Sequence, residues 1–322
     1  MKENAYAKLN LCLEIGGILP NGYHELKSVM QSVSLHDVVS VSESDGITVS
    51  CSSPRVPGGE KNLVFKAAVA FFETARLTGK PPGEYITFSA PPFYTGKEIT
   101  EEEICAIAGR IAAMLPQEGL VLVAGLGNND ITPDAIGPRT ARQVLATRHI
   151  SSELKAQAGL ENLRAVAVLA PGVLGQTGIE TSEIIHAVTQ DIKPCAVIAV
   201  DALAARSASR LGCTVQVANT GISPGSGVMN HRKELSTQTL GVPVVSIGVP
   251  TVVDAATLAG DLLSGDSESE EIRALFEPQG QKMMITPREI DNLISHACKI
   301  LSLSINKALQ PDLTLEEIGQ LV

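Results

Sequence analysis

Residues 195–201 read CAVIAVD, a run of small and apolar residues that ends on an acid. A strand with one solvated face alternates apolar and polar residues, so a continuous apolar run of this length predicts a strand covered on both faces. Further strands are predicted at 119–124, 164–170, 214–218 and 243–249. The stretches with helical character lie at 100–115, 134–149, 182–191, 251–263, 287–308 and 314–321. Helices that alternate with buried strands predict an α/β fold, a three-layer α/β/α sandwich around a mostly parallel sheet.

The first part of the chain, residues 1–80, has a different pattern. Residues 5–15 alternate small or apolar with polar residues and predict a half-buried strand. Shorter strands are predicted at 38–41 and 47–51, a turn at 19–22 and a helix at 62–77. The sequence Lys80-Pro81-Pro82-Gly83 then stops any helix. We therefore place a domain boundary there, with a small α+β unit at 1–80 and a larger domain at 81–322.

The charge balance of the 322-residue chain is acidic. Its net charge is −10 and its pI is near 5.2, with charged residues at 19% of the total. Such a surface repels phosphate backbones and attracts basic proteins, so no direct nucleic-acid partner is expected. Aromatic residues make up 3% and tryptophan is absent, which argues against base-stacking platforms.

Membrane and disulfide signals are also missing from the sequence. The apolar runs are much shorter than the roughly 20 residues that a membrane-spanning helix needs, and residues 1–8 lack the apolar core of a signal peptide. We therefore expect no membrane partner and a cytoplasmic protein. The six cysteines are scattered, without a Cys-x-x-Cys pair, which indicates reduced and mostly buried thiols.

Three segments follow predicted strands, and functional residues gather at the carboxyl ends of parallel strands. The first, residues 125–138, reads GLGNNDITPDAIGP and contains Asp134 at the start of a predicted helix. An aspartate there is either an N-cap that satisfies free amide donors or a catalytic acid. The second segment begins with Asp201, directly after the buried strand. An acid in that position has fewer structural roles, so Asp201 is the stronger candidate for a functional acid.

The third segment, residues 171–180, reads PGVLGQTGIE, and its backbone amides either line a cleft or turn a corner. The residues that we predict to line a substrate cleft are Asn128, Gly175, Gln176, Thr177, Arg206 and Ser223. For Arg206 a solvated role is the alternative. Ser223 also fits the Gly-x-Ser-x-Gly pattern of serine hydrolases, but a nucleophile elbow leads straight into a helix, whereas residues 224–227 read PGSG and predict a loop. We therefore expect this loop to line the cleft or to be structural, and Ser223 not to be a nucleophile.

The sequence carries no recognisable metal or cofactor motif. No His-Glu-x-x-His pattern occurs, and His149, His186 and His231 are isolated from one another. The pair Gly125 and Gly127 lacks the third glycine of a dinucleotide fingerprint, and no Gly-Lys-Ser/Thr phosphate loop is present. We therefore expect no metal and no cofactor.

The three segments, in this order, resemble the germination proteases of spore-forming bacteria. The matching motifs are GLGN and TPDAIGP within 125–138, ATRH at 146–149, APGVLGQTGIET at 170–181, DALAARS at 201–207 and NTGISPGSGV at 219–228. Weaker matches run from 83–87 to 285–291, so the resemblance covers the chain from about residue 81 onward.

The resemblance implies an endopeptidase that starts the degradation of small acid-soluble spore proteins during germination, in the spore core. It implies a fold similar to that of hydrogenase-maturation peptidases and a homo-oligomer, a tetramer in the family. Asp134 and Asp201 fall on the family's essential acid pair. Two carboxylates held close cannot both ionise easily, so one accepts a proton from water while the other donates to the peptide. The maturation peptidases use a similarly placed pair to recognise a metal, which leaves metal recognition as an alternative to an aspartic-type mechanism.

Residues 1–79 resemble a different family, the diphosphocytidyl-methylerythritol kinases of isoprenoid synthesis. The resemblance rests on AYAKLNL at 5–11, PNGYHEL at 20–26, VMQSV at 29–33 and NLV at 62–64. It implies substrate-side positions for Lys8, Asn10, Tyr23 and His24. The likeness ends before the glycine- and serine-rich phosphate loop of these kinases, so we expect a truncated kinase-like fragment without kinase activity. A kinase-like fusion and an inactive fusion are the alternatives to a protease, and the propeptide of a germination protease zymogen has no counterpart in residues 1–79.

Overall fold

The computed structural model describes residues 2–18, 24–40, 47–53, 56, 58–78, 81, 83–95, 97, 99–157, 159–225, 233–263 and 283–322. Contacts between Cα atoms divide the chain into two compact units, Met1–Lys80 and Pro81–Val322. The predicted turn at 19–22, the predicted substrate-side residue Tyr23, His231 and the end of the glycine-rich loop at 226–228 lie outside the described residues.

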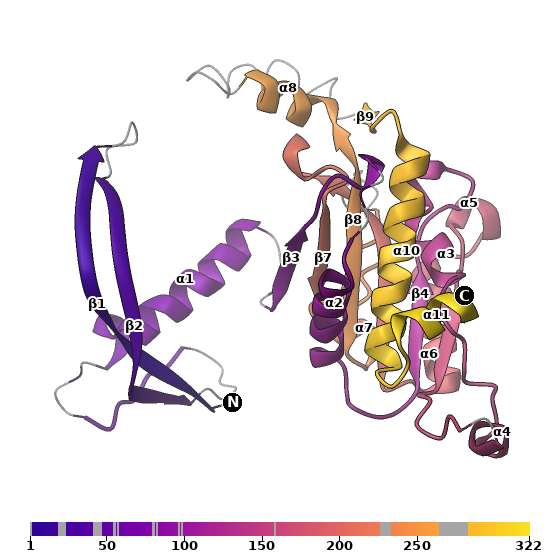
Figure 1. Ribbon diagram of the computed structural model, residues 1–322, viewed down its shortest axis with the longest axis horizontal. Helices are drawn as coiled ribbons and strands as arrows, with labels where there is room; N and C mark the ends of the chain where they lie inside the picture. The colour runs from indigo at the N-terminus through magenta and orange to yellow at the C-terminus, as the bar shows by residue number, and fades with distance from the viewer. Residues whose placement is uncertain are drawn as a thin grey trace. The chain divides into compact units, whose positions relative to one another are not determined.

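An antiparallel hairpin opens the first unit (Figure 1, indigo). Its strands are β1 (Lys2–Ile18) and β2 (His24–Ser40), which pair from Lys2 opposite Ser40 to Ile18 opposite His24. The 3-10 helix η1 (Gly59–Lys61) and the helix α1 (Leu63–Thr78) follow. The strand predicted at 5–15 and the helix predicted at 62–77 are thus confirmed.

Two shorter strands predicted for this unit are not separate elements. Residues 38–40 are the end of β2. The strand predicted at 47–51 is wrong, because the backbone there is irregular. The residues alternate half-buried and exposed, as a strand would, but a strand also needs a neighbour for its amide groups.

One sheet runs through the second unit, with the strand order β3-β7-β8-β6-β4-β5 and β9 beside β8. Its strands are β3 (Tyr85–Ser89), β4 (Val121–Gly125), β5 (Val166–Leu169), β6 (Ala196–Ala205), β7 (Thr214–Ala218), β8 (Val244–Asp254) and β9 (Met284–Ile285). The neighbours β5, β4, β6 and β8 are parallel, whereas β7 and β9 run antiparallel to β8 and β3 runs antiparallel to β7. The parallel half of the sheet therefore contains all the strands that lead into the predicted functional segments.

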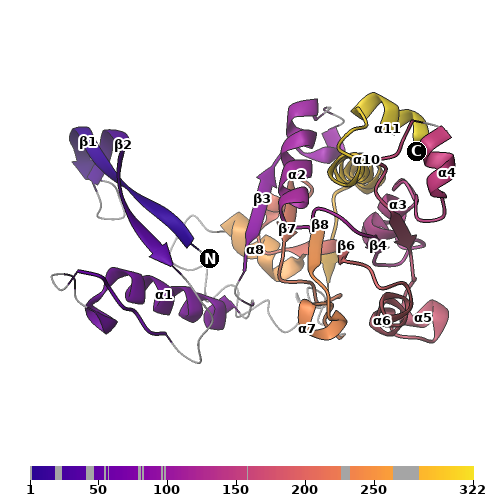
Figure 2. The same cartoon turned by 90° about the horizontal axis from the view of Figure 1, so that it is seen from below.

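Helices cover both faces of this sheet, as Figure 2 shows. On one face lie α2 (Glu101–Ala113), α3 (Ile136–Ala141) and α10 (Ile290–Leu309), and on the other lie α6 (Thr181–Ile192) and α7 (Thr237–Leu240). The shorter elements are η2 (Phe93–Thr95), η3 (Thr132–Asp134), α4 (Ser152–Gln157), α5 (Leu174–Thr177), η4 (Ala208–Arg210), α8 (Ala255–Leu263) and α11 (Leu315–Leu321). The predicted three-layer α/β/α sandwich is confirmed. Among the described helices, none is both long and apolar enough to span a bilayer.

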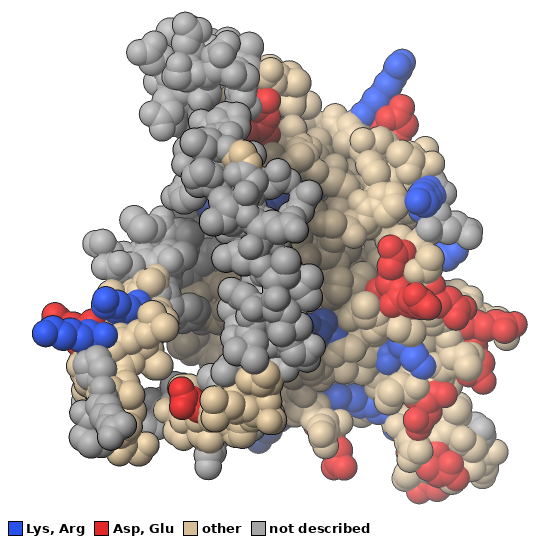
Figure 3. Space-filling view, turned by 60° about the vertical axis from the view of Figure 1, so that its left-hand side comes forward, with Lys and Arg blue, Asp and Glu red and all other residues tan. Residues whose placement is uncertain are grey.

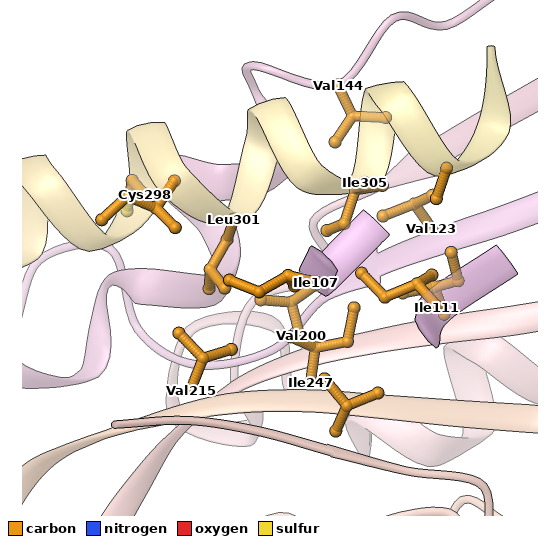
Figure 4. Close-up of a cluster of buried hydrophobic side chains, with 14 of the residues drawn as sticks. Ile107, Ile111, Val123, Val144, Val200, Val215, Ile247, Cys298, Leu301 and Ile305 are labelled. Atoms are coloured by element: carbon orange, nitrogen blue, oxygen red, sulfur yellow. The ribbon is translucent and has the colours of Figure 1, made fainter. Parts of the chain in front are cut away.

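The core explains why the strand that decides the fold is apolar throughout. Side chains of β6 alternate between two buried clusters: Ala196, Ile198 and Val200 belong to the first, and Val197 and Ala199 to the second. In Figure 4 the first cluster joins side chains of α2 and α10 to Val200 and to Ile247 of β8. Because both faces of β6 are covered, no position between 196 and 200 is free to be polar.

The predicted start of α2 is confirmed by its capping box. The Oγ1 of Thr100 accepts a hydrogen bond from the Glu103 amide at 3.3 Å, and the Oε2 of Glu103 accepts one from the Thr100 amide at 2.8 Å. Together these bonds satisfy two amide groups that a helix leaves without partners in its first turn. This local signal can be read from four consecutive residues.

Two other predicted boundaries are wrong, and one strand was missed. The helix predicted at 134–149 is only α3, because the chain leaves the helix to bond β5: the amides of Thr147 and Arg148 each donate to the carbonyl of Val166 at 2.9 Å. The helix predicted at 251–263 begins at Ala255, because residues 251–254 continue β8. Strand β3, which was not predicted, pairs with β7 from Tyr85 opposite Ala218 to Ser89 opposite Thr214.

The cysteine prediction is half right. The described cysteines Cys51, Cys105, Cys195, Cys213 and Cys298 are free thiols, but only Cys298 is buried. Burial raises the pKa of the Cys298 thiol, and partial burial raises the pKa of the Cys213 thiol. The exposed cysteines are Cys51, in the irregular segment after β2, and Cys105, on the solvent side of α2. No core is available to either side chain.

We predict that the hydrogen bonds of the Asn306 side chain are among the main contacts that hold α10 against the connection after α3. Its side chain is 1% exposed, its Oδ1 accepts from the Leu145 amide at 2.9 Å, and its Nδ2 donates to the Gln143 carbonyl at 2.8 Å. Asn306→Ala leaves both backbone groups unsatisfied, so the free energy of unfolding should fall by about 2 kcal/mol. Urea unfolding followed by circular dichroism measures this loss.

Asn162→Ala is the matched control, because the exposed Nδ2 of Asn162 bonds only the Asp312 side chain in this structure. We expect it to change stability by less than about 0.5 kcal/mol. An Asn306→Ala variant that unfolds at the same urea concentration as the control would contradict the assigned role.

Candidate functional site

The carboxyl end of β4 is joined to the middle of β6 by a backbone hydrogen bond. The strands are parallel, with Gly125 beside Val200, and the Leu126 amide donates to the Val200 carbonyl at 2.8 Å. The first residue after β4 is therefore fixed beside the residue that precedes Asp201. The segments at 125–138 and 201–207, which are far apart in the sequence, begin side by side.

Helix α3 approaches this edge without an intervening side chain at Gly137. A β-carbon at that position would collide with the carbonyl oxygens of Leu126 and Val200. The helix backbone thus rests directly on the backbone of β4's exit and of β6. Residues between Leu126 and Gly137, which include Asp134, are consequently confined to the carboxyl edge of these two strands.

Asp134 closes this confined segment on itself. It is the last residue of η3, its amide donates to the Ile131 carbonyl at 2.8 Å, and its Oδ2 accepts from the Asn128 amide at 2.7 Å. Gly127 has a φ of +110°, and a β-carbon there would collide with the Asp134 carbonyl oxygen, so only glycine fits. The element η3 contacts β6, β8 and α10. Ala135 occupies the N-cap position of α3, so the alternative role of Asp134 as the cap of that helix is wrong.

Asp201 lies within β6 and not after it, which corrects the prediction. The strand continues to Ala205 because these residues pair with β8, with Asp201 opposite Gly248 and Ala205 opposite Val253. The side chain is 5% exposed, and its Oδ1 accepts from the Ala202 amide at 2.9 Å. The alternation along β6 directs Asp201 to the same side as Val197 and Ala199. Burying a carboxyl group this deeply costs free energy unless the group is hydrogen-bonded. Such burial is unusual for an acid without a function.

Two of the predicted cleft residues meet across the loops. The Nε2 of Gln176 donates to the Oδ1 of Asn128 and to the Oδ2 of Asp130, each at 2.8 Å. Gln176 belongs to α5, on the connection from β5 to α6, so the first and third segments touch at this point. The neighbours of Gln176, Gly175 and Thr177, are exposed, and the Thr177 hydroxyl donates to the Val173 and Ile179 carbonyls within its own loop.

Asp130 was not predicted as a site residue. The one feature of the sequence that indicates it is its position directly after a pair of asparagines.

The other two predicted cleft residues have different settings. Arg206 is exposed and directly follows the last residue of β6. Ser223 follows Ile222, which exchanges two backbone hydrogen bonds with Leu235, and it precedes a turn at Pro224 and Gly225. A nucleophile elbow leads from a strand straight into a helix, whereas the described residues that follow Ser223 form a turn.

Charged groups around the described surface follow no single sign. On the face shown in Figure 3, basic side chains lie scattered between acidic ones, with no broad basic area among the coloured residues. Within the part of the chain that the structure describes, no group of three or more His, Cys, Asp and Glu side chains is placed to hold a metal ion. His149 and His186 are exposed.

A cavity of about 710 Å³ lies at the opposite end of the parallel strands. Its lining includes Leu120 before β4, Ala165 before β5, and the small residues Ala108 and Ala112 of α2. Arg164 lines it too, but its guanidinium donates to the carbonyls of Gly119 at 2.9 Å and Pro116 at 2.7 Å, which is a structural role. We place the candidate site at the carboxyl edge instead, because both buried or partly buried acids stand there.

Known proteins similar to this chain are germination proteases. The family model described as germination protease matches residues 59–265. The germination protease of Caldanaerobacter subterraneus subsp. tengcongensis is 42% identical over 297 residues, which cover 84% of this chain and 91% of that protein. Germination proteases of Clostridium perfringens (strain ATCC 13124) and Geobacillus sp. (strain WCH70) are 40% and 36% identical, each over 77% of this chain and over 84% and 82% of the relative.

A solved structure is also similar to this chain. It is the [NiFe] hydrogenase maturation protease HycI from Thermococcus kodakarensis KOD1, with a TM-score of 0.35 and 17% identity over 62% of this chain and 98% of that one. The matched family model spans more than half of the chain, and its relatives are aligned over most of their own length. The chain therefore belongs to the germination protease family.

Proposed function

We propose that this chain is an endopeptidase of spore germination in which Asp134 and Asp201 together activate the attacking water. The observation that carries the proposal is the position of the two acids at the carboxyl edge of neighbouring parallel strands, Asp201 within β6 and Asp134 on the connection out of β4. Open α/β sheets bind their ligands at this edge. Membership of the germination protease family supports the peptidase activity.

The two carboxyl groups take complementary roles in the proposed reaction. One is ionised and accepts a proton from water as the oxygen attacks the carbonyl carbon of the peptide. The other is protonated, donates a hydrogen bond to the carbonyl oxygen, and supplies the proton that the departing nitrogen needs. Like charges held close favour a single shared proton, so the pair titrates as a unit.

The scaffold supports such a pair because it restricts both acids. Strand β6 is hydrogen-bonded to β4 on one side and to β8 on the other, and both its faces are covered. The Asn128 amide donates to the Oδ2 of Asp134, which restricts the orientation of the carboxyl group. Catalytic groups on buried strands and closed loops keep their geometry better than groups on open loops.

The substrates that we propose are small acid-soluble spore proteins, with the spore core as the compartment. This assignment rests on the family, as does the proposed homo-oligomeric state. The predicted cleft residues Gly175, Thr177, Arg206 and Ser223 are proposed to contact the peptide. Their partial or full exposure is compatible with a role in binding a chain that comes from solution.

Replacement of either acid tests the catalytic assignment. Asp134→Asn and Asp201→Asn keep the shape of the side chain but remove its ability to exchange a proton, so kcat should fall by about 10³-fold or more. Cleavage of a purified small acid-soluble spore protein, followed by mass spectrometry, measures the loss. Asp191→Asn, at an exposed position in α6, is the matched control and should retain wild-type activity. Full activity in either site variant, with an unchanged circular dichroism spectrum, would remove that acid from the mechanism.

Treatment with a chelator distinguishes the acid-pair mechanism from metal recognition. We expect hydrolysis to proceed unchanged after treatment with a chelator, because the two carboxyl groups supply both proton transfers. The measurement is the rate before and after exhaustive dialysis against EDTA, with a zinc peptidase as the positive control. Loss of activity that zinc or nickel restores would favour a metal-dependent reaction.

Replacement of Ser223 distinguishes the acid-pair mechanism from that of a serine hydrolase. Because Ser223 precedes a turn and not a helix, we expect Ser223→Ala to keep kcat within about threefold of the wild-type value. A fluorophosphonate probe should leave the native protein unlabelled. Labelling at Ser223, together with inactivity of Ser223→Ala, would overturn the aspartic-type assignment.

A further inference from the structure

The side chain of Gln176 contacts the segment that carries Asp134 from a second loop. The Nε2 of a glutamine has two hydrogens, and here one goes to the Oδ1 of Asn128 and the other to the Oδ2 of Asp130. Both acceptors belong to the connection from β4 to η3, whereas Gln176 belongs to α5 on the connection from β5 to α6. The contact therefore spans two loops that are separate in the sequence.

The contact reaches Asp134 through Asn128. The side-chain oxygen of Asn128 accepts from Gln176 and from the Asp130 amide at 2.9 Å, which fixes the orientation of this residue. The backbone amide of the same residue donates to the Oδ2 of Asp134 at 2.7 Å. A hydrogen bond from a backbone amide to a carboxylate is charge-assisted, so its direction constrains the carboxyl group.

Gln176 is itself held in its loop. Its backbone amide donates to the Val173 carbonyl at 2.9 Å, and its Oε1 faces Gly172, where an added β-carbon would stand 3.2 Å from that oxygen. The Gly172 carbonyl accepts from the Thr181 hydroxyl at 2.9 Å, at the first residue of α6. The side chain of Gln176 thus connects the loop before α6 to Asn128, whose backbone amide bonds Asp134.

We propose that Gln176 is a positioning residue that sets the orientation of the Asp134 carboxyl group through Asn128. The inference rests on the proposed function, and it gives Gln176 a role other than the peptide contact that its place in a glycine-rich loop suggested. All the groups involved are exposed or partly buried, so water can replace the lost hydrogen bonds when Gln176 is removed. Loss of the side chain should therefore disturb the orientation of Asp134 much more than the stability of the fold.

Steady-state kinetics distinguish positioning from substrate contact. Gln176→Ala should lower kcat about tenfold, since a small misplacement of a catalytic group is costly, and should leave KM within about twofold of the wild-type value. Gln190→Ala, which makes the same change at an exposed position of α6, is the matched control. It should change kcat by less than about twofold. A raised KM with unchanged kcat in Gln176→Ala would make Gln176 a substrate contact and overturn the proposal, as would unchanged kcat and KM.

A second variant tests the hydrogens that Gln176 donates. Gln176→Glu keeps the size of the side chain but places a carboxylate against Asp130, so kcat should fall further than in Gln176→Ala. Adding Asp130→Asn removes the like charge and should bring kcat back at least to the value of Gln176→Ala. A Gln176→Glu variant as active as wild type would show that donation from Gln176 is not needed.

Hydrogen exchange tests the same contact without catalysis. The amide of Asn128 should exchange about tenfold faster in Gln176→Ala than in the wild-type protein or Gln190→Ala, because its hydrogen bond to Asp134 is no longer held in place. Equal exchange in all three proteins would contradict the proposal. If the wild-type protein cleaves no substrate, the proposed function fails, and the exchange rates still decide whether Gln176 positions Asn128.

Discussion

The structure of the site depends on the hydrogen bond from the Leu126 amide to the Val200 carbonyl. This bond continues the parallel pairing of β4 and β6 by one residue, to the point where the chain leaves β4. The backbone contact of Gly137 with the same two residues then returns the chain to the same edge. Asp134 lies between these two fixed points in the sequence and Asp201 directly follows Val200, so the pairing of the two strands ties both segments to the same part of the sheet. A side chain at position 137 would collide with the backbone of Leu126 and Val200, so α3 could not keep this position against the sheet.

The burial of β6 has a second consequence for the site. An acid within a strand that is covered on both faces has little freedom, which suits a group that must keep its geometry while the substrate changes. The loops after β4 and β5 are more exposed, and the contact of Gln176 with Asn128 joins them. The site thus combines one acid placed by the core with one acid placed by a loop.

The sequence predicts those parts of the fold whose signals are local. Continuous apolar runs identified the strands of the parallel half, and the capping box at Thr100 identified the start of α2. Long-range pairing was not predictable: β6 extends past Asp201 because β8 lies beside it, and α3 ends early because Thr147 and Arg148 bond to Val166. The contact of Gln176 with Asn128 joins residues 48 positions apart and leaves no pattern in the sequence. The kinase-like resemblance of residues 1–79 stays a prediction, and the germination protease family model begins at residue 59, before the end of the first unit.

A double-mutant cycle on Asp134 and Asp201 tests the central claim most directly, because it asks whether the two acids act as one unit. Each acid is replaced by asparagine, singly and together, and kcat is measured on the same spore protein substrate. If the acids share one proton transfer system, the double variant should be about as active as the weaker single variant. Independent effects that multiply in the double variant would contradict the account.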